Sequence, residues 1–288
     1  MVLQVLAERR GQGVILVVVS AIVFSTAGIF TKGIPVDAWT VIFWRGVAAA
    51  GFTLLYLAMT RRLGSEMRQM RGPGWLVVVL SALGTAAFIP AFKLTSVANV
   101  ALIYAASPFV AAALAWLALR ERPSPPVVVG SLLALCGVAL IVGGSLGGGS
   151  LRGDLLALWM TLMMSAVMVV YRRWPETPAA LPAVLSSIVL LPPALIFADP
   201  LRVEASALPA LIAFGLIFAI ASVTLLEGAR RLPSAEAALL SALETPFAPL
   251  LAWLILAELP ATLTVLGGVI VLVAVFGAQI WQIAQKRV

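Results

Sequence analysis

The sequence lacks the residue types on which much enzyme chemistry depends. Its 288 residues include no histidine, one cysteine, Cys136, and 12 acidic residues, with no pair of acids at a matching depth in its apolar segments. A zinc protease, a histidine-dependent hydrolase and a di-aspartate intramembrane protease each need one of these missing features. A single cysteine also excludes an intramolecular disulfide. We therefore expect a protein that is not an enzyme and that needs neither a metal nor a cofactor.

A phosphate-binding loop is missing as well. The glycine-rich stretch 143–150, GGSLGGGS, contains no lysine and follows an apolar segment. This pattern is typical of a flexible link and not of a nucleotide site. ATP-driven pumping is therefore excluded.

Charge is scarce, and hydrophobic residues dominate the chain. Charged residues make up 11% and hydrophobic residues 62%, with a mean hydropathy of +1.10. Apolar runs reach the ~20 residues that a helix needs to cross a hydrocarbon core of about 30 Å. The alternating ten-residue segments typical of a membrane β-barrel are absent. The composition predicts an all-α membrane protein whose solvent is a lipid bilayer.

Glycines, prolines and charged clusters divide the chain into apolar spans. We predict ten transmembrane helices, at 13–32, 38–60, 74–93, 97–119, 125–144, 153–171, 178–198, 207–229, 234–257 and 261–283. All connections are short, so we expect no soluble domain.

Positive charges are distributed unequally between the two sides of this arrangement. If the N-terminus is cytoplasmic, 14 of the 19 Lys and Arg residues lie on the cytoplasmic side, four lie outside and Arg45 falls within a span. Short loops rich in Lys and Arg stay in the cytoplasm, so both termini are expected there. This sidedness accounts for the basic composition, and we expect no nucleic-acid partner.

The first span also permits a second interpretation. Arg9 and Arg10, the apolar stretch 14–24 and the small residues 25–28 resemble a signal peptide cleaved after Ala27. Cleavage would leave an odd number of spans, and the apolar stretch continues through Phe30. We therefore interpret the segment as a transmembrane helix.

Two stretches of the chain repeat each other. Residues 94–109 align with 232–247 at an offset of 138, and both end in Ser/Thr-Pro-Phe. After a one-residue gap, Ala-Trp-Leu, Glu-x-Pro and Gly follow in the same order in both stretches. This pattern predicts a duplication of five spans, with repeats at 1–146 and 151–288.

The second repeat must enter the membrane upside down, because five is an odd number of spans. Loop charges agree with this inversion. Arg120 and Arg122 flank Glu121 in the first repeat, whereas the second retains Glu258 without either arginine. Inverted repeats are typical of secondary transporters, whose substrate site lies near the midplane between the halves.

Five spans with Pro-Phe in the fourth, followed by Trp-Leu and Glu-x-Pro, resemble the EamA domain of the drug/metabolite transporter superfamily. The resemblance covers the whole chain and is strongest over 94–142 and 232–275. Within that superfamily the chain is similar to bacterial inner-membrane exporters of aromatic amino acids and paraquat. This similarity implies export of amino acids and related small amphiphilic metabolites by alternating access, carried out by a monomer or a homodimer.

The resemblance also implies a central cavity lined by the first, third and fourth helices of each repeat. Helical spacing supports this, because small polar and aromatic residues share one face of these helices. The same pattern is typical of helix packing in membranes, which is the alternative. The predicted substrate-binding residues are Ser20, Phe24, Thr31, Ser81, Gly84, Thr85, Phe88, Phe92, Tyr104, Ser107, Trp159, Met163, Phe218, Ser222, Ser241, Glu244 and Thr245.

Glu244 is the acid in the middle of an apolar span. It lies about ten residues, or about 15 Å, from either end of its helix, too deep to reach the headgroups. Its counterpart in the first repeat is Ala106, and Pro246 follows it closely. We interpret Glu244 as a cavity residue that meets a substrate ammonium group or takes up a proton. A protonated or hydrogen-bonded structural glutamate is the alternative.

The other charges receive structural interpretations. Arg45 lies beside Trp39 and Trp44, and we expect it to anchor the second span in the outer aromatic belt. We expect the remaining charges in solvent at span ends, for Lys32, Lys93, Glu227, Arg230 and Arg231, and at helix ends, for Glu121, Glu236 and Glu258.

Nucleotide sugars and lipid intermediates are the alternative solutes in the same superfamily. Such anionic cargo calls for several arginines or lysines in the cavity, and only the second span offers a deep one. An ion channel is a further alternative, although the sequence shows no ring of charged residues. Amino-acid-like cargo is therefore favoured.

Overall fold

The computed structural model describes residues 2–146, 150–232 and 234–285. Within these ranges it contains helices and no β-strand, and ten helical spans are long and apolar enough to cross a membrane. Each span begins and ends within three residues of its predicted position. The predicted fold class, an all-α protein with ten transmembrane helices, is confirmed.

Six of the spans are single helices, and α3 shows how such a helix begins. The Asp37 carboxylate accepts the backbone N–H groups of Trp39 and Thr40, both at 2.9 Å. These bonds satisfy two of the donors that the first turn of a helix leaves free. The six are α3 (Ala38–Met59), α5 (Gly72–Leu94), α8 (Pro125–Gly144), α9 (Leu151–Arg173), α12 (Leu208–Ala229) and α15 (Thr262–Gln285).

The other four spans are each broken into two helices, which differs from the continuous helices that we predicted. The pairs are α1 (Val2–Ser25) with α2 (Ala27–Gly33), α6 (Val97–Ala105) with α7 (Ser107–Leu119), α10 (Ala180–Val189) with α11 (Leu191–Phe197), and α13 (Ser234–Ser241) with α14 (Glu244–Leu256). The fourth and ninth spans, which correspond in the two repeats, break at corresponding places.

Local chemistry explains each break. Pro108, Pro192 and Pro246 lie in the first turn after three of them, and proline has no N–H with which to continue the helical bonding. No proline lies at the first break. There the hydroxyls of Ser25 and Thr26 bond to the carbonyls of Ala21 and Val23 instead, at 2.7 and 2.6 Å, a pattern that bends helices.

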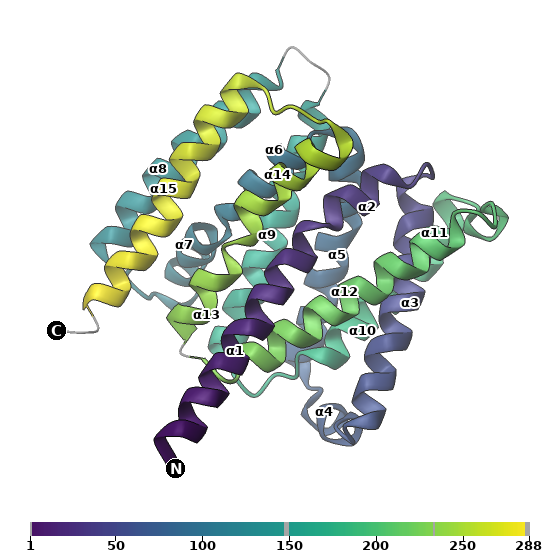
Figure 1. The fold of residues 1–288 in the computed structure, drawn as a ribbon, viewed down its shortest axis with the longest axis horizontal. Coiled ribbons are helices and arrows are strands. Elements are labelled where there is room, and N and C mark those ends of the chain that lie inside the picture. The colour runs from purple at the N-terminus through teal and green to yellow at the C-terminus, as the bar shows by residue number, and fades with distance from the viewer. Residues whose placement is uncertain (1, 147–149, 233, 286–288) are drawn as a thin grey trace.

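The two repeats pack as an inverted pair. The third helix of each repeat contacts the first helix of the other repeat, in α5 with α9 and in α12 with α1. It also contacts the second helix of the other repeat, in α12 with α3 and in α5 with α10. The fifth helices, α8 and α15, lie side by side at one edge of the bundle (Figure 1). This exchange of equivalent contacts follows from the upside-down insertion of the second repeat.

Glycines allow the closest of these helix contacts. A Cβ atom at Gly267 of α15 would lie 2.4 Å from the carbonyl oxygen of Gly137 in α8. A Cβ atom at Gly215 of α12 would lie 2.8 Å from the carbonyl oxygen of Arg45 in α3. Small residues hold helices together in membranes because they let backbones approach each other.

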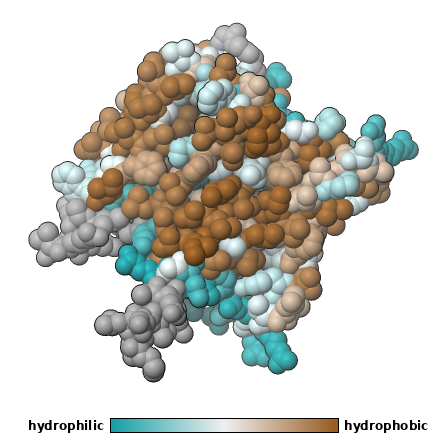
Figure 2. Space-filling view, in the orientation of Figure 1, coloured by the Kyte–Doolittle hydropathy of each residue, from teal (hydrophilic) through white to brown (hydrophobic). Residues whose placement is uncertain are grey.

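Apolar side chains cover the outer surface. Leu117, Ile196 and Leu254 are among the large hydrophobic residues that are more than half exposed. Figure 2 shows hydrophobic residues over most of one face of the molecule, with hydrophilic residues gathered toward its ends. Such a surface is stable in lipid and not in water.

The two ends of the bundle differ in charge. One end, which we call the arginine-rich face, carries α4 (Leu63–Gln69) and the arginines at 61, 62, 68, 71, 120, 122, 172, 173, 230 and 231. The other end, the opposite face, carries α2, α11 and the short 3-10 helix η1 (Pro200–Arg202) (Figure 1). The sequence analysis assigned 14 of the 19 Lys and Arg residues to one side of the ten spans. In the structure, the arginines just named lie at one end of the bundle.

The inverted arrangement predicts how cysteines at the two ends react. Ser65 of α4 and Ala261, just before α15, are both exposed, and they lie on opposite faces. In a Cys136→Ala background, a membrane-impermeant maleimide should label Ser65→Cys and Ala261→Cys from opposite sides of sealed vesicles. Both should react after permeabilisation. Labelling of both from one side would refute the ten-span fold.

Candidate functional site

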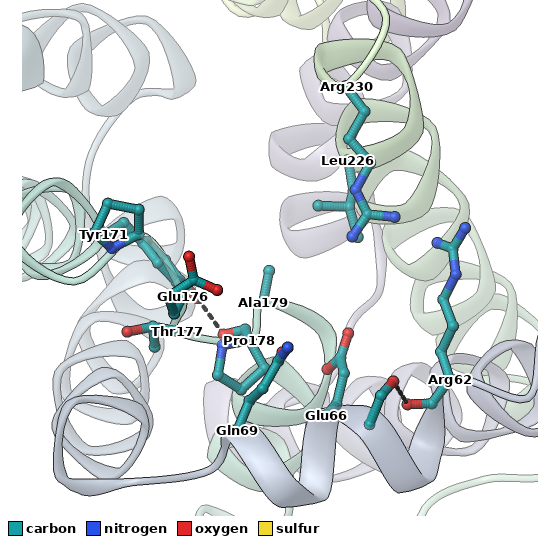
Figure 3. Close-up of a pocket in the computed structure, with 12 residues that line it drawn as sticks. Arg62, Glu66, Gln69, Tyr171, Glu176, Thr177, Pro178, Ala179, Leu226 and Arg230 are labelled. Atoms are coloured by element: carbon teal, nitrogen blue, oxygen red, sulfur yellow. Dashed lines mark hydrogen bonds between the residues drawn. The ribbon is translucent and has the colours of Figure 1, made fainter.

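A cavity of about 640 Å³ lies at the arginine-rich face. We call it the vestibule. Its wall combines charged residues of both signs with hydrogen-bonding groups from α4, α9, α12 and the loop after α9 (Figure 3). The lining residues are Arg62, Ser65, Glu66, Gln69, Tyr171, Pro175, Glu176, Thr177, Pro178, Ala179, Leu226 and Arg230.

Glu227 connects three arginines beside the vestibule. Its carboxylate accepts hydrogen bonds from Arg62 at 2.5 Å, from Arg230 at 2.9 Å and from Arg231 at 3.0 Å, and a fourth from the Tyr56 hydroxyl at 2.9 Å. The hydrogen bond with Glu227 raises the pKa of Arg62, so this arginine stays a cation. We expected Glu227, Arg230 and Arg231 in solvent at span ends; the two arginines keep partial exposure there, and the three residues also form a bonded cluster.

Glu66 joins the two repeats at the same face. Its buried carboxylate accepts the backbone N–H of Leu181 at 2.6 Å. This bond satisfies a free donor in the first turn of α10, where a negative charge is favourable. Helix α4 of the first repeat is thereby fixed to the second repeat.

A second, smaller cavity of about 70 Å³ continues the vestibule into the bundle. The two share Ala179 and Leu226. The smaller cavity, which we call the inner cavity, is lined by α3, α10 and α12, and two predicted binding residues, Phe218 and Ser222, belong to its wall.

Arg45 is buried against two aromatic rings of α12, which corrects our prediction that it anchors the outer aromatic belt. Arg45 is only 3% exposed. Its guanidinium carbon lies 4.4 Å from the ring centroid of Phe218 and 5.6 Å from that of Phe214. Arginine in hydrocarbon costs roughly 2.5–3.5 kcal/mol on insertion scales, and cation–π contacts return about 0.5–2 kcal/mol. Two such contacts together are comparable in size to this cost, and neither ring supplies a counterion.

The sequence hid the role of Arg45 because two tryptophans lie close to it in the chain. Trp44 instead donates a hydrogen bond to the carbonyl of Pro200 at 2.8 Å, at the opposite face. The rings that receive the guanidinium belong to α12, about 170 residues later. No local sequence pattern indicates that α3 packs against α12. The contact between Arg45 and the two rings could therefore be recognised only in the structure.

The opposite face carries polar contacts both between the repeats and within the first repeat. Lys32 of α2 forms an ion pair with Glu258 at 2.7 Å, and Glu258 also accepts the backbone N–H of Val97 at 2.7 Å. Lys93 donates to the carbonyl of Ile34 at 2.7 Å. The helix-end role expected of Glu258 agrees with the Val97 bond. Lys32 and Lys93 are bonded to protein and are not simply solvated.

Two other acidic residues, both expected at helix ends, form ion pairs. Glu121 pairs with Arg172 at 2.5 Å. Glu236 pairs with Arg10 at 3.2 Å. The side chain of Ser234, the other half of the expected capping box, lies outside the described side chains. Both acids therefore tie helices together at the arginine-rich face.

A buried polar network below the opposite face was missed from the sequence. Asp154, fully buried at 0% exposure, accepts hydrogen bonds from Thr95 at 2.6 Å and from Asn99 at 3.0 Å. Asn99 in turn accepts a bond from Thr264 at 2.7 Å. The network joins α6, α9 and α15, and its satisfied donors make a buried carboxylate tolerable. We assign it to holding the helices together.

Glu244 opens α14 at the break in the ninth span. Its backbone carbonyl accepts a hydrogen bond from Ser25 at 3.2 Å, at the break in the first span. The neighbouring Phe24 meets Phe218 edge to face, with ring centroids 5.5 Å apart. Among the described residues, the Glu244 carboxylate takes part in no ion pair and no hydrogen bond. The predicted residues Phe24, Phe218 and Glu244 are thus brought to one region of the interior.

The remaining predicted binding residues separate by exposure. Phe24, Phe218 and Glu244 are partly exposed. The other predicted residues that are partly exposed are Ser81, Thr85, Phe88, Tyr104, Ser222, Ser241 and Thr245. Ser20, Thr31, Gly84, Phe92, Ser107 and Met163 are buried. Ser20 donates to the Ala221 carbonyl at 2.9 Å between α1 and α12, and the Ser107 carbonyl accepts from Ser165 at 3.0 Å. Ser20 and Ser107 are therefore part of contacts between helices.

Two predictions about cavity lining need correction. A Cβ atom at Gly84 would lie 2.3 Å from the Met164 side chain, so Gly84 is part of the α5–α9 contact and not of a cavity wall. Trp159 is 46% exposed and lies on the same outward stripe of α9 as Leu155 and Leu162. Its ring therefore faces lipid. Both residues fitted the spacing of one helix face. That spacing does not reveal whether the face contacts a cavity, another helix or lipid.

Metal coordination finds no support in the described part of the chain. No three His, Cys, Asp or Glu side chains gather there as a metal-binding group. Vestibule, inner cavity and Arg45 offer charge and hydrogen bonds, and they present no nucleophile paired with a base. Such an arrangement can bind a solute without changing it.

Comparison with known proteins gives a family and a fold. The model of the EamA-like transporter family matches residues 11–143 and again residues 151–279. A solved structure titled only "Crystal structure of protein" is 17% identical, with a TM-score of 0.66, and the match covers 96% of this chain and 98% of that one. A search of curated proteins finds no match. The solved structure, at this identity, supports the fold alone.

The ion pair at the opposite face predicts a measurable coupling between Lys32 and Glu258. Their side chains are 25% and 20% exposed, so their attraction is less screened than that of a surface pair. A double-mutant cycle with Lys32→Met and Glu258→Gln should give a coupling of about 1 kcal/mol. The readout is thermal unfolding in detergent, where about 1 kcal/mol moves the midpoint by a few degrees.

Arg202 and Asp199 supply a matched control for that cycle. This pair also lies at the opposite face, 3.1 Å apart, but its side chains are 86% and 58% exposed. The same cycle there should give at most about 0.5 kcal/mol. Equal couplings at the two pairs would contradict a structural role for the Lys32–Glu258 bond.

Proposed function

Because the chain belongs to the EamA-like transporter family, we propose that it is a secondary transporter that moves small solutes by alternating access between its inverted repeats. The observation that carries this proposal is the pair of cavities that lead into the bundle from the arginine-rich face. Ion pairs join the repeats at both ends, Arg62–Glu227 beside the vestibule and Lys32–Glu258 at the opposite face. This arrangement is the one expected of a carrier open toward one side.

The arginine-rich face is cytoplasmic in this proposal. Short loops rich in arginine remain in the cytoplasm, and the described arginines gather at that end of the bundle. The membrane is the bacterial cytoplasmic membrane, both termini lie on its cytoplasmic side, and the vestibule opens toward the cytoplasm. A solute is then taken from the cytoplasm and released outside after the repeats rock.

The solute proposed is an amino acid or a related small amphiphilic metabolite. The inner region offers aromatic rings at Phe24 and Phe218 together with Glu244, whose carboxylate has no protein cation among the described residues. Apolar surface with few polar groups is typical of a small-molecule site. Glu244 then meets the ammonium group of the solute or takes up a proton.

Initial flux against pH tests this role of Glu244. In proteoliposomes, Glu244→Gln should lower amino-acid flux about tenfold or remove its pH dependence, because the amide keeps the volume and loses the charge. Glu236→Gln is the matched control, since Glu236 belongs to the same span but pairs with Arg10 at the surface. It should leave the flux and its pH profile unchanged.

Superimposable pH profiles at an unchanged rate for Glu244→Gln would make Glu244 a packing residue. Thermal unfolding of both variants in detergent separates a loss of function from a loss of fold.

A further inference from the structure

We propose that Arg45 binds the carboxylate of the transported solute, in a subsite formed with Phe214 and Phe218 at the end of the inner cavity. This inference rests on the proposed function and names the substrate class as zwitterionic α-amino acids. The residues that carry it are a buried arginine without a counterion and the two rings on which it lies.

The Arg45 side chain extends toward Phe218 of α12. Arg45 is the eighth residue of α3, about 10 Å from the start of that helix at 1.5 Å per residue. Phe218 is the eleventh residue of α12, about 15 Å from its start on the same side of the bundle. The guanidinium lies closer to Phe218 than to Phe214, at 4.4 Å against 5.6 Å. An arginine that served the interface would extend the other way.

The cation lacks a counterion within the described residues. Arg45 takes part in none of the ion pairs found there, and its Nε atom, shielded from solvent, has no hydrogen-bond acceptor. A buried cation without an anion is costly, and arginines in membranes pair or mark a substrate pathway. The missing partner must carry negative charge.

The inner cavity and this cation share one side chain, the ring of Phe218. Ala49 and Thr53 line the cavity one and two turns beyond Arg45 on α3, and residues four apart share a helix face. Phe218 belongs both to the cavity wall and to the surface on which the guanidinium lies. A solute that enters from the vestibule therefore meets Phe218 and then Arg45.

The position of Glu244 argues for a zwitterion and against a simple anion. Phe24 contacts Phe218 edge to face, and the residue after Phe24, Ser25, donates to the Glu244 carbonyl. Arg45 thus lies on one ring of an aromatic pair, and the backbone of Glu244 is bonded to the residue that follows the other ring. An α-amino acid with an apolar side chain presents the matching groups, namely a carboxylate, an ammonium and a hydrophobic surface. Guanidinium also matches a carboxylate in its planar, two-pronged geometry, which lysine cannot reproduce.

Three related probes isolate the carboxylate. Phenylalanine carries both charged groups, phenethylamine lacks the carboxylate, and 3-phenylpropionate lacks the ammonium. In proteoliposomes with wild-type protein, phenethylamine should compete with labelled phenylalanine about tenfold or more weakly than unlabelled phenylalanine does. With Arg45→Gln, phenylalanine flux should fall about tenfold, and the two competitors should become nearly equal.

Arg45→Lys and Arg202→Gln complete the set. The lysine variant should recover only part of the preference for phenylalanine, since its charge is kept and its geometry is lost. Arg202, exposed at the opposite face and paired with Asp199, is the control, and its variant should behave as wild type. Gel filtration and thermal unfolding check that each variant is folded. If Arg45→Gln is unstable, Phe218→Leu replaces it, and loss of the same preference is expected.

The outcomes separate the two proposals. No phenylalanine flux by wild-type protein above that of empty liposomes would refute the proposed function. Normal flux by folded Arg45→Gln or Phe218→Leu, with the wild-type preference over phenethylamine intact, would refute only the carboxylate subsite. Equal competition by 3-phenylpropionate and phenylalanine in wild type would overturn the zwitterion assignment.

Discussion

Backbone hydrogen bonding in lipid is the constraint on which this structure depends. A peptide group that faces hydrocarbon must bond within its own helix, so a helix can break only where protein or a cavity surrounds it. The breaks at Thr26 and at Ala242–Leu243 meet inside the bundle, where Ser25 of one repeat donates to the carbonyl of Glu244 in the other. The protein interior in which helices can break is therefore also where polar groups are available to bind a solute.

Inversion of the repeats turns this interior into a pathway with two unlike ends. Equivalent helices exchange partners across the bundle, but duplication did not preserve the charges. Arg120 and Arg122 in the first repeat have no counterparts beside Glu258, which pairs instead with Lys32. Among the described residues, the Lys32–Glu258 ion pair and its neighbouring bonds join the repeats at one end. The other keeps a charged vestibule, bordered by the cluster around Glu227.

The sequence predicted what depends on local patterns, namely the ten spans, their inversion and the depth of Glu244. It did not predict contacts between distant helices. Arg45 looked like an interfacial anchor because Trp39 and Trp44 are close in the chain, whereas its rings come from α12. Asp154 and Asn99 meet only after α6 and α9 pack together. Gly84 and Trp159 fitted the spacing of a cavity-facing helix surface, but that spacing does not identify the neighbouring helix. In the structure Gly84 packs against Met164, and Trp159 is exposed on the outer, lipid-facing surface.

The central claim is that the two ends open in alternation around one interior site, and distances between spin labels at each end test it most directly. Labels at Gly33 and Ala261 report on the opposite face, and labels at Ser65 and Thr177 report on the arginine-rich face, all in a Cys136→Ala background. Adding saturating phenylalanine to protein in nanodiscs should shift part of the first distance distribution to longer values and part of the second to shorter values. Two unchanged distributions under conditions that support flux, or two that lengthen together, would contradict the account.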